Sequence, residues 1–249
     1  MLVKTISVRI KAVRIIDMTS TGLIPYSVGD RLQRDIHRRV VDGEEDTLIF
    51  LHHEPTFTAG RATKPEDIPD STLPVVSVDR GGSVTWHGPG QLVVYPIIRL
   101  REPIDVLQYI MALQRSVIDM LKEAYNLDTC LVRGRSGVWM CQEGEMDRKL
   151  CALGVKQAQA VTMHGIALNV NPDVSNFHRI IPCGLFDAGV TTLQQLACVG
   201  PDTSVSQLVE PLADKMTYYL QRCQACVQQP APWPPHTPMM YAPPSEKEN

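Results

Sequence analysis

The sequence predicts an α/β fold of the α+β kind, in which a mixed, largely antiparallel sheet carries flanking helices. Two observations predict it: segments with strand-like patterns outnumber segments with helical periodicity, and several predicted strands follow one another with only polar turns between them. The chain has 249 residues, 44% of them hydrophobic, which is enough for one domain with a sizeable core. We therefore expect a single domain over 1–227 and a proline-rich tail over 228–249.

The N-terminal part is expected to form a strand, a helix and a second strand. The stretch "SVRIKAVRII" alternates as strands do. Between residues 27 and 42 apolar residues recur at every fourth position, which predicts an amphipathic helix with a basic outer side; they are Val28, Leu32, Ile36 and Val40. "TLIFLHH" then predicts a buried strand. The following "EPTFTAGRATKPEDIPDSTLP" is rich in Pro, Gly and Asp, which predicts a long irregular loop.

The rest of the domain is expected to be mostly strands. "VVSV" and "LVVYPIIRL" predict strands on either side of a glycine-rich loop, "DRGGSVTWHGPGQ". A second amphipathic helix is marked by Val106, Ile110, Leu113 and Val117. "SGVWMC", "KLCALGVKQ" and "AVTMHGIALNVN" predict further strands, and a last helix is expected over 205–222. In the tail, the prolines predict extended, unpaired chain with no catalytic part.

Composition and charge argue against several classes of function. A formal net charge of -3 gives no electrostatic basis for binding nucleic acid or an acidic membrane surface. No apolar run approaches the roughly 20 residues that span a bilayer, and the first residues lack the apolar core of a secretory signal. Seven cysteines, an odd number without regular spacing, predict reduced thiols. We expect a cytoplasmic protein, with a mitochondrial location as the alternative because the N-terminus is basic.

Metal and phosphate sites have little support in the sequence. The glycine-rich loop lacks the Gly-Lys-Ser/Thr ending of a phosphate-binding loop, and a predicted strand follows it where a dinucleotide fingerprint would continue into a helix. A pocket wall and a simple hairpin connection explain this loop equally well. The histidines show neither zinc spacing nor i,i+4 pairs, so we expect no metal and no other cofactor.

Cys183, in "RIIPCGLFDAG", is the candidate nucleophile. The alternative is a buried structural thiol, which is the commoner role of free cysteine. A thiol with an ordinary pKa near 8.5 is mostly protonated at pH 7, so a nucleophilic role requires a nearby cation. Lys149, at the start of "KLCALGV", is a candidate for that cation. An ammonium about 4 Å away favours a thiolate by about 4 kcal/mol at an effective dielectric of about 20.

Three segments in this order resemble the lipoyl(octanoyl) transferases: "RGGSVTWHGPGQLVVYPI", "KLCALGVKQAQAVTMHGIALNVN" and "RIIPCGLFDAGVTTL". Upstream, "LIFLHHEPTFTAGR" resembles the N-terminal motif of the same family, and the resemblance extends over about residues 13–210. The chain departs from the family at two positions. Trp86 stands where tyrosine is usual, and Cys151 stands where a small apolar residue is common.

This resemblance implies a fold like the catalytic domains of biotin protein ligases and lipoate ligases. It implies an acyltransferase that moves octanoyl from acyl carrier protein to a specific lysine of lipoyl domains, as the first step of endogenous protein lipoylation. The acceptors would be 2-oxoacid dehydrogenase E2 subunits and the glycine cleavage H protein. Carried over position by position, Cys183 resembles the nucleophile that holds the acyl thioester, and Lys149 resembles the group that lowers its pKa.

Three segments resemble the walls of the family's acyl pocket. They are Arg80, Gly81, Gly82, Ser83, Val84, Thr85, Trp86 and His87; Ala152, Leu153 and Gly154; and Gly165, Ile166 and Ala167.

The implied reaction agrees with the chemistry of the residues. Exchange of one thioester for another is nearly isoenergetic, so a ping-pong route needs no ATP. The attacking lysine must be neutral, so either neutral Lys149 or the departing thiolate must accept its proton. We expect backbone N–H groups of Cys183, Gly184 and the Gly81–Gly82 loop to bind the oxyanion. An acidic carrier protein would dock on arginines, for which the candidates are Arg31, Arg34, Arg38, Arg39, Arg133, Arg135 and Arg148.

Three other functions remain open at this stage. An ATP-dependent ligase of the lipoate or biotin type would share the fold but would form an adenylate and would not need Cys183. A non-catalytic binder of lipoyl domains or acyl carriers would tolerate Cys183→Ala. A thioesterase would use the same acyl-cysteine and release free octanoate to water.

Overall fold

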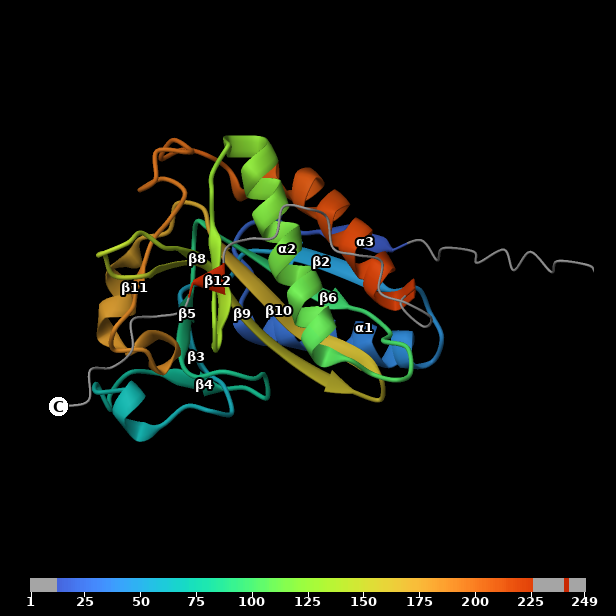
Figure 1. Ribbon diagram of the computed structural model, residues 1–249. Coiled ribbons are helices and arrows are strands. Elements are labelled where there is room, and N and C mark those ends of the chain that lie inside the picture. The colour runs from blue at the N-terminus through green and yellow to red at the C-terminus, as the bar shows by residue number, and fades with distance from the viewer. Residues whose placement is uncertain (1–12, 226–239, 242–249) are drawn as a thin grey trace, which may run out of the picture.

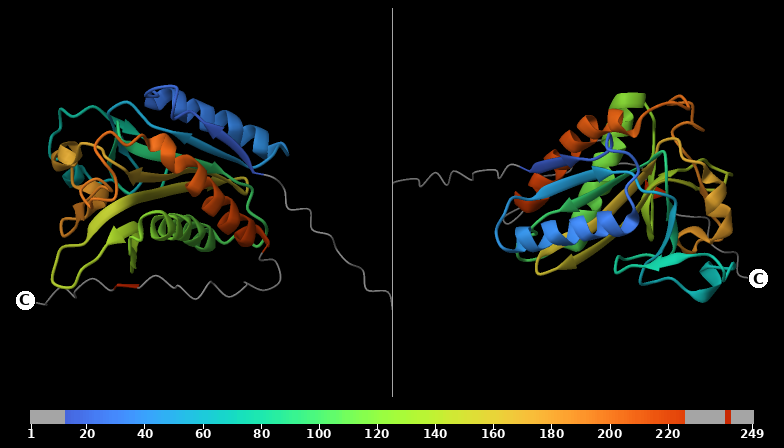
Figure 2. Two further views of the ribbon diagram at one scale, coloured as in Figure 1. Left: turned by 90° about the horizontal axis from the view of Figure 1, so that it is seen from above. Right: turned by 180° about the vertical axis from the view of Figure 1, so that it is seen from behind.

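A central sheet lies between two layers of helices in the computed structural model, which describes residues 13–225 and 240–241 (Figures 1 and 2). Helix α1 (Tyr26–Val41) covers one face of the sheet. Helices α2 (Val106–Tyr125) and α3 (Val209–Ala225) pack side by side on the other face. The three predicted helices are confirmed, and a 3-10 turn, η4 (Val205–Leu208), leads into the last of them.

The main sheet is mixed and largely antiparallel, as predicted. In the described chain its strands are ordered β1 (Arg14–Asp17), β2 (Thr47–Leu51), β6 (Gln91–Ile97), β10 (Val161–Asn169), β9 (Arg148–Ala158), β8 (Arg135–Met140), β7 (Cys130–Val132) and β12 (Met240–Tyr241). Neighbours from β2 to β7 are antiparallel, whereas β1 and β12 join the two edges in parallel. The short β11 (Gly189–Val190) runs parallel to β9.

The central strands are apolar throughout because helices cover both faces of the sheet. In β2, Leu48 and Phe50 pack with α2 and α3, whereas Ile49 and Leu51 pack with α1. All four side chains are fully buried. This arrangement explains why "TLIFL" is a continuous apolar run rather than an alternating one.

Two predicted loops contain strands, and in this respect the prediction was wrong. Strands β4 (Val75–Ser77), β3 (Thr56–Ala59) and β5 (Thr85–His87) form a small second sheet in that order, visible at the lower left of Figure 1. The "TFTA" segment has the β-branched and aromatic residues that fit a strand, and it pairs with the "TWH" of the glycine-rich stretch. The prolines that suggested an irregular loop lie outside β3, one of them at the start of the 3-10 turn η1 (Pro65–Asp67).

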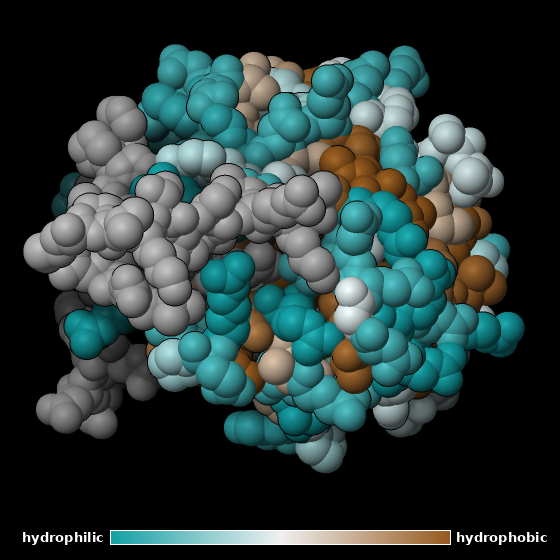
Figure 3. Space-filling model, turned by 90° about the vertical axis from the view of Figure 1, so that its right-hand side faces the viewer, coloured by the Kyte–Doolittle hydropathy of each residue, from teal (hydrophilic) through white to brown (hydrophobic). Residues whose placement is uncertain are grey.

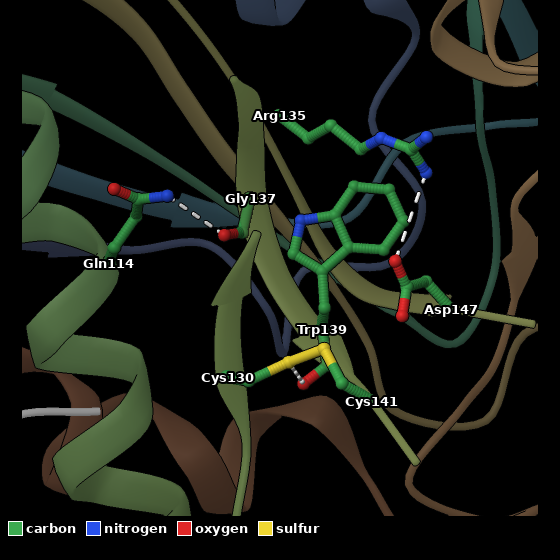
Figure 4. Close-up of a disulfide and its surroundings, with 7 residues drawn as sticks. All are labelled: Gln114, Cys130, Arg135, Gly137, Trp139, Cys141 and Asp147. Carbon is green, nitrogen blue, oxygen red and sulfur yellow. Dashed lines mark hydrogen bonds and ion pairs between the residues drawn. A yellow bond between two sulfur atoms is a disulfide. The ribbon is translucent and has the colours of Figure 1, made fainter. Parts of the chain in front are cut away.

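Two of the cysteines form a disulfide, so the prediction that all thiols are reduced was also wrong (Figure 4). Cys130 lies in β7 and Cys141 directly follows β8, and the antiparallel pairing of these strands brings their Cα atoms within 6.3 Å. That separation is in the normal range for a disulfide. The pairing depends on strand register, which a count of cysteines does not reveal.

The predicted ends of the chain fall largely outside the described residues. Strand β1 starts at Arg14, and the earlier part of "SVRIKAVRII" lies outside. Within the tail, Met240–Tyr241 pairs with β7, contrary to the prediction of unpaired chain.

The end of the molecule away from the small sheet is mostly hydrophilic, with hydrophobic areas between the polar side chains (Figure 3). Within the described residues, no helix has both the length and the hydropathy needed to cross a membrane.

Candidate functional site

A cavity of about 140 Å³ gathers most of the predicted site residues. Its walls come from the glycine-rich stretch before and within β5, from β9 and β10, and from the loop that carries Cys183. The predicted residues in its lining are Arg80, Gly82, Ser83, Thr85, His87, Lys149, Ala152, Leu153, Gly154, Gly165, Ile166, Ala167 and Cys183.

Gly81, Val84 and Trp86 are the predicted residues that do not line this cavity. Val84 and Trp86 alternate with Thr85 and His87, and their side chains pack in a separate apolar cluster with Phe57 and other residues. Successive side chains of a strand point to opposite faces, so β5 offers only every second residue to the cavity. The backbone N–H of Gly81 donates to the Val155 carbonyl oxygen at 2.9 Å.

Glycines allow the segment around Arg80 to approach the main sheet. A Cβ on Gly154 would lie 2.9 Å from the carbonyl oxygen of Gly81 and 3.0 Å from Cδ of Arg80. A Cβ on Gly60 would lie 2.3 Å from the carbonyl oxygen of Gly82. Both contacts are too short for any side chain, so these positions require glycine.

Cys183 lies in a strained turn, η3 (Pro182–Gly184), beside the cavity. Its φ is 60°, and that of Gly184 is 69°, so two successive residues adopt the left-handed conformation. A non-glycine residue in this region is uncommon and is often found at functional sites. The Cys183 N–H donates to the carbonyl oxygen of Val84 at 2.9 Å, which attaches the turn to the residue that precedes β5. Cys183 as a residue is partly exposed, unlike the buried Cys151.

Lys149 approaches the same cavity from β9. The segment that follows Cys183 returns to this strand, where the Thr191 N–H donates to the Lys149 carbonyl oxygen at 3.0 Å. The Lys149 ammonium lies 4.5 Å from the centre of the buried Trp139 ring, in a cation–π contact. Gly137 leaves room for the lysine, because a Cβ there would lie 3.4 Å from Lys149 Cε and 2.5 Å from the Cys151 carbonyl oxygen.

The disulfide cysteines pack in one apolar cluster with Trp139, whose ring contacts this lysine. Figure 4 shows the Trp139 side chain beside the Cys130–Cys141 bond, with the Gln114 amide donating to the Gly137 carbonyl oxygen at 2.8 Å nearby. The apolar cluster of Cys130, Trp139 and Cys141 also includes Leu185, two residues after the candidate nucleophile.

Several cavity residues were not predicted from the sequence; they are Tyr26, Val93, Tyr95, Gly134, Arg135, Ser136, His164 and Leu185. Tyr95 donates its hydroxyl hydrogen to His53 Nε2 at 2.7 Å, because His53 Nδ1–H is used by the carbonyl oxygen of Ile24 at 2.9 Å. Burial raises the pKa of Tyr26 to about 12 and that of Tyr95 well above its ordinary value. This wall of the cavity is therefore polar but uncharged at neutral pH.

His87 and His164 also line the cavity as neutral rings. Burial lowers the pKa of His87 to about 3, and the His87 Nδ1–H donates to the Gln91 side-chain oxygen at 2.8 Å. Burial also lowers the pKa of His164, although its Nε2 lies 2.7 Å from an Asp79 oxygen. Partial burial would raise the pKa of Asp79, but hydrogen bonds from Arg34, Lys156 and His164 hold it well below its usual range. His164 precedes Gly165 in a predicted motif, which is the signal that could have identified it.

The predicted oxyanion donors are mostly used within the protein. The Cys183 N–H binds the Val84 carbonyl oxygen, the Gly184 N–H binds that of Ile181 at 3.0 Å, and the Gly81 N–H binds that of Val155. Of the predicted donors, the Gly82 N–H has no hydrogen bond in the described chain.

Most of the predicted docking arginines are paired with carboxylates. Arg34, Arg38 and Arg39 on α1 form ion pairs with acidic residues of the same helix or of the segment that follows it, and Arg34 also pairs with the distant Asp79. Arg135 pairs with Asp147 and Asp187. Within the described chain we find no ion pair for Arg31, Arg133 or Arg148.

Cys151, the other thiol close to Lys149 in sequence, lies in the core at 1% exposure. Burial raises its pKa to about 12, so it stays protonated and unreactive at neutral pH. Among the described residues there is no cluster of three His, Cys, Asp or Glu side chains that could hold a metal ion.

The chain is similar to known proteins in both sequence and fold. Residues 26–217 match the family model described as the lipoyl protein ligase A/B catalytic domain. The chain is 46% identical over 203 residues to the octanoyltransferase of Mycobacterium leprae (strain Br4923), which covers 80% of this chain and 85% of that protein. It is 42% identical over 198 residues to the octanoyltransferase of Corynebacterium glutamicum (strain R), covering 79% and 78%.

Solved structures show the same fold at low sequence identity. A bi-partite lipoate protein ligase from Thermoplasma acidophilum matches with a TM-score of 0.63 and 14% identity, over 84% of each chain. Lipoate-protein ligase A bound with ATP matches with a TM-score of 0.60 and 13% identity, over 84% of this chain and 85% of that one. The expectation of a lipoate-ligase-like catalytic domain is thus confirmed.

Proposed function

The chain belongs to the lipoyl protein ligase A/B catalytic family and is an octanoyltransferase, and we propose that it takes octanoyl from acyl carrier protein onto Cys183 and passes it to a lysine of a lipoyl domain. The observation that carries this proposal is the cavity that is lined by both the partly exposed Cys183 and Lys149.

In the first half-reaction, the Cys183 thiolate attacks the thioester carbonyl of octanoyl-phosphopantetheine. The carbon–sulfur bond to pantetheine breaks, a new thioester forms on Cys183, and the departing pantetheine sulfur takes a proton from the Lys149 ammonium. The Gly82 N–H, which has no internal partner, is the donor that we assign to the oxyanion.

In the second half-reaction, a neutral lysine of the acceptor attacks the Cys183 thioester. The amide bond forms, the carbon–sulfur bond to Cys183 breaks, and neutral Lys149 accepts the proton that the attacking amine loses. The amide is more stable than the thioester, so this step completes the transfer without ATP. The apolar part of the lining, which includes Leu153, Ile166 and Ala167, is suited to the acyl chain.

The acceptor is proposed by analogy with a relative of the fold. The archaeal lipoate protein ligase of similar structure is described with its E2 lipoyl domain as parts of one lipoylation system, and we infer that this enzyme also modifies lipoyl domains. The glycine cleavage H protein is a second proposed acceptor.

An ATP-dependent ligase is the alternative that the fold neighbours raise, since one of them binds ATP. A transfer assay on a lipoyl domain separates the two. We expect octanoyl-acyl carrier protein to support transfer without ATP, and we expect loss of activity in Cys183→Ser and a large decrease in Lys149→Ala. Transfer that needs free octanoate and ATP, and that survives Cys183→Ser, would contradict the proposal.

A further inference from the structure

Arg80 is a buried cation with no ion pair among the described residues. Its exposure is 8%, and it is one of the residues that line the cavity. Nη1 donates to the carbonyl oxygens of Gly81 at 3.0 Å and Ser83 at 2.8 Å, and Nη2 donates to the carbonyl and hydroxyl oxygens of Thr58, both at 2.9 Å. All four acceptors are neutral. Burying a charge costs free energy unless an opposite charge compensates it. An anion in the cavity would therefore be stabilised by the Arg80 guanidinium.

Cys183 is the acid near Arg80 that is best able to supply this anion. The acidic groups that interact electrostatically with Arg80 are Tyr26, Tyr95 and Cys183. Burial raises the pKa of both tyrosines, so they remain neutral at physiological pH. The thiol is also tied to the same segment as the guanidinium: Arg80 binds the carbonyl oxygen of Ser83, and the Cys183 N–H binds that of the next residue, Val84.

The other charged groups around the nucleophile do not compensate Arg80. From η1, the Asp67 carboxylate accepts hydrogen bonds from the Ser83 hydroxyl and the Lys64 N–H, and its oxygens lie 3.5 Å from the position of a Cβ on Gly184. This negative charge opposes a thiolate on Cys183, so the thiolate needs cations nearby.

Of the remaining ionisable groups that line the cavity, His87 and His164 carry no charge, the charge of Arg135 is offset, and Lys149 is positive only when it is protonated. His87 and His164 are neutral because burial lowers the pKa of each, and the Arg135 charge is offset by Asp147 and Asp187. Lys149 contributes a positive charge from β9 whenever it is protonated.

The proposed reaction requires Lys149 to lose that charge. A lysine that accepts the proton of the attacking amine starts the second half-reaction neutral, so its charge changes during each catalytic cycle. A guanidinium stays charged throughout, because arginine is not deprotonated in proteins.

We propose that Arg80 is the fixed counter-charge of the Cys183 thiolate, whereas Lys149 carries the protons. Arg80 acts through the nucleophile and is a positioning residue. The inference rests on the proposed function only in taking Cys183 as the reacting thiol.

The rate of Cys183 alkylation by iodoacetamide, followed by peptide mass spectrometry from pH 5 to pH 10, tests this assignment on the full chain. We expect Arg80→Met to move the midpoint of the pH profile upward by about one pH unit, which slows alkylation about tenfold at pH values below the midpoint. Arg80→Lys should restore most of the shift because it keeps the charge. Arg99→Met is the matched control, since Arg99 also binds backbone carbonyls, those of Val40 and Val41, but lies outside the cavity.

An unchanged midpoint in Arg80→Met would overturn the assignment, whatever the midpoint of Lys149→Met. If circular dichroism shows that Arg80→Met does not fold, the alkylation midpoint of Lys149→Met tests the assignment instead. A midpoint well below that of free cysteine supports a second fixed cation, and a midpoint equal to that of free cysteine refutes it. Alkylation does not depend on octanoyl transfer, so this result is separate from any failure of the transfer assay.

Discussion

Acid should destabilise this enzyme steeply, because two neutral histidines lie in and behind the cavity. His53 and His87 are 0% and 7% exposed, and their ring centres lie 5.8 Å apart. Burial lowers the pKa of His53 from 6.5 to about 4 and that of His87 to about 3. In the unfolded chain both histidines bind a proton as the pH falls through about 6.5. In the folded chain they stay unprotonated until the pH approaches their lowered pKa values. Stability is therefore fully present above pH 6.5 and is lost as the pH falls toward these folded-state values.

The size of the loss follows from the two shifts. Each histidine lowers the free energy of unfolding by about 1.4 kcal/mol per pH unit in this window. Between pH 7 and pH 4.5 the two together remove about 5 kcal/mol, which is comparable with the whole stability of a small domain. His87→Gln keeps a hydrogen-bonding side chain beside Gln91 and removes one titrating group, so the loss should fall to about half.

Urea unfolding followed by circular dichroism at constant ionic strength, from pH 7.5 to pH 4.5, measures this slope. His178→Gln is the control, because His178 is exposed and its replacement should leave the slope unchanged. A wild-type slope no steeper than that of His87→Gln would refute the reasoning.

Two further predictions concern stability. Gly165→Ala would place a Cβ 2.2 Å from the carbonyl oxygen of Val94, so we expect a loss of about 3 kcal/mol or more in thermal melts. Gly200→Ala, whose nearest neighbour would be 3.9 Å away, should melt like wild type, and equal losses in both would contradict the packing explanation. Replacing Cys130 and Cys141 together by serine should cost about 3 kcal/mol in non-reducing buffer. Dithiothreitol should lower the Tm of wild type but not of this double variant, and equal Tm values in both buffers would count against the bond.

The longer strands of the main sheet and the three helices could be predicted, because each shows a hydrophobic pattern of its own. The short strands β3, β5, β7, β11 and β12 could not, since two to four residues show too little pattern and their pairing depends on the rest of the fold. For the same reason the alternation that turns Val84 and Trp86 away from the cavity was not foreseen.

In the candidate site, too, residues in local sequence motifs could be predicted, and residues brought in by tertiary packing could not. Cys183, Lys149 and the glycine-rich segments lie in continuous motifs, so their residues could be named from sequence. Tyr26 and Tyr95 reach the cavity from α1 and β6, whose placement depends on the packing of α1 and on strand register. The Cys130–Cys141 bond depends on register as well.

The acyl-enzyme itself tests the central claim most directly. Intact mass of the full chain would be measured after incubation with octanoyl-acyl carrier protein, without ATP and without an acceptor, beside Cys183→Ser. The account predicts one octanoyl group on wild type, released by hydroxylamine, mapped to Cys183 and missing from the variant. Octanoylation of an added lipoyl domain with no adduct on the enzyme, or an equal adduct on Cys183→Ser, would contradict it.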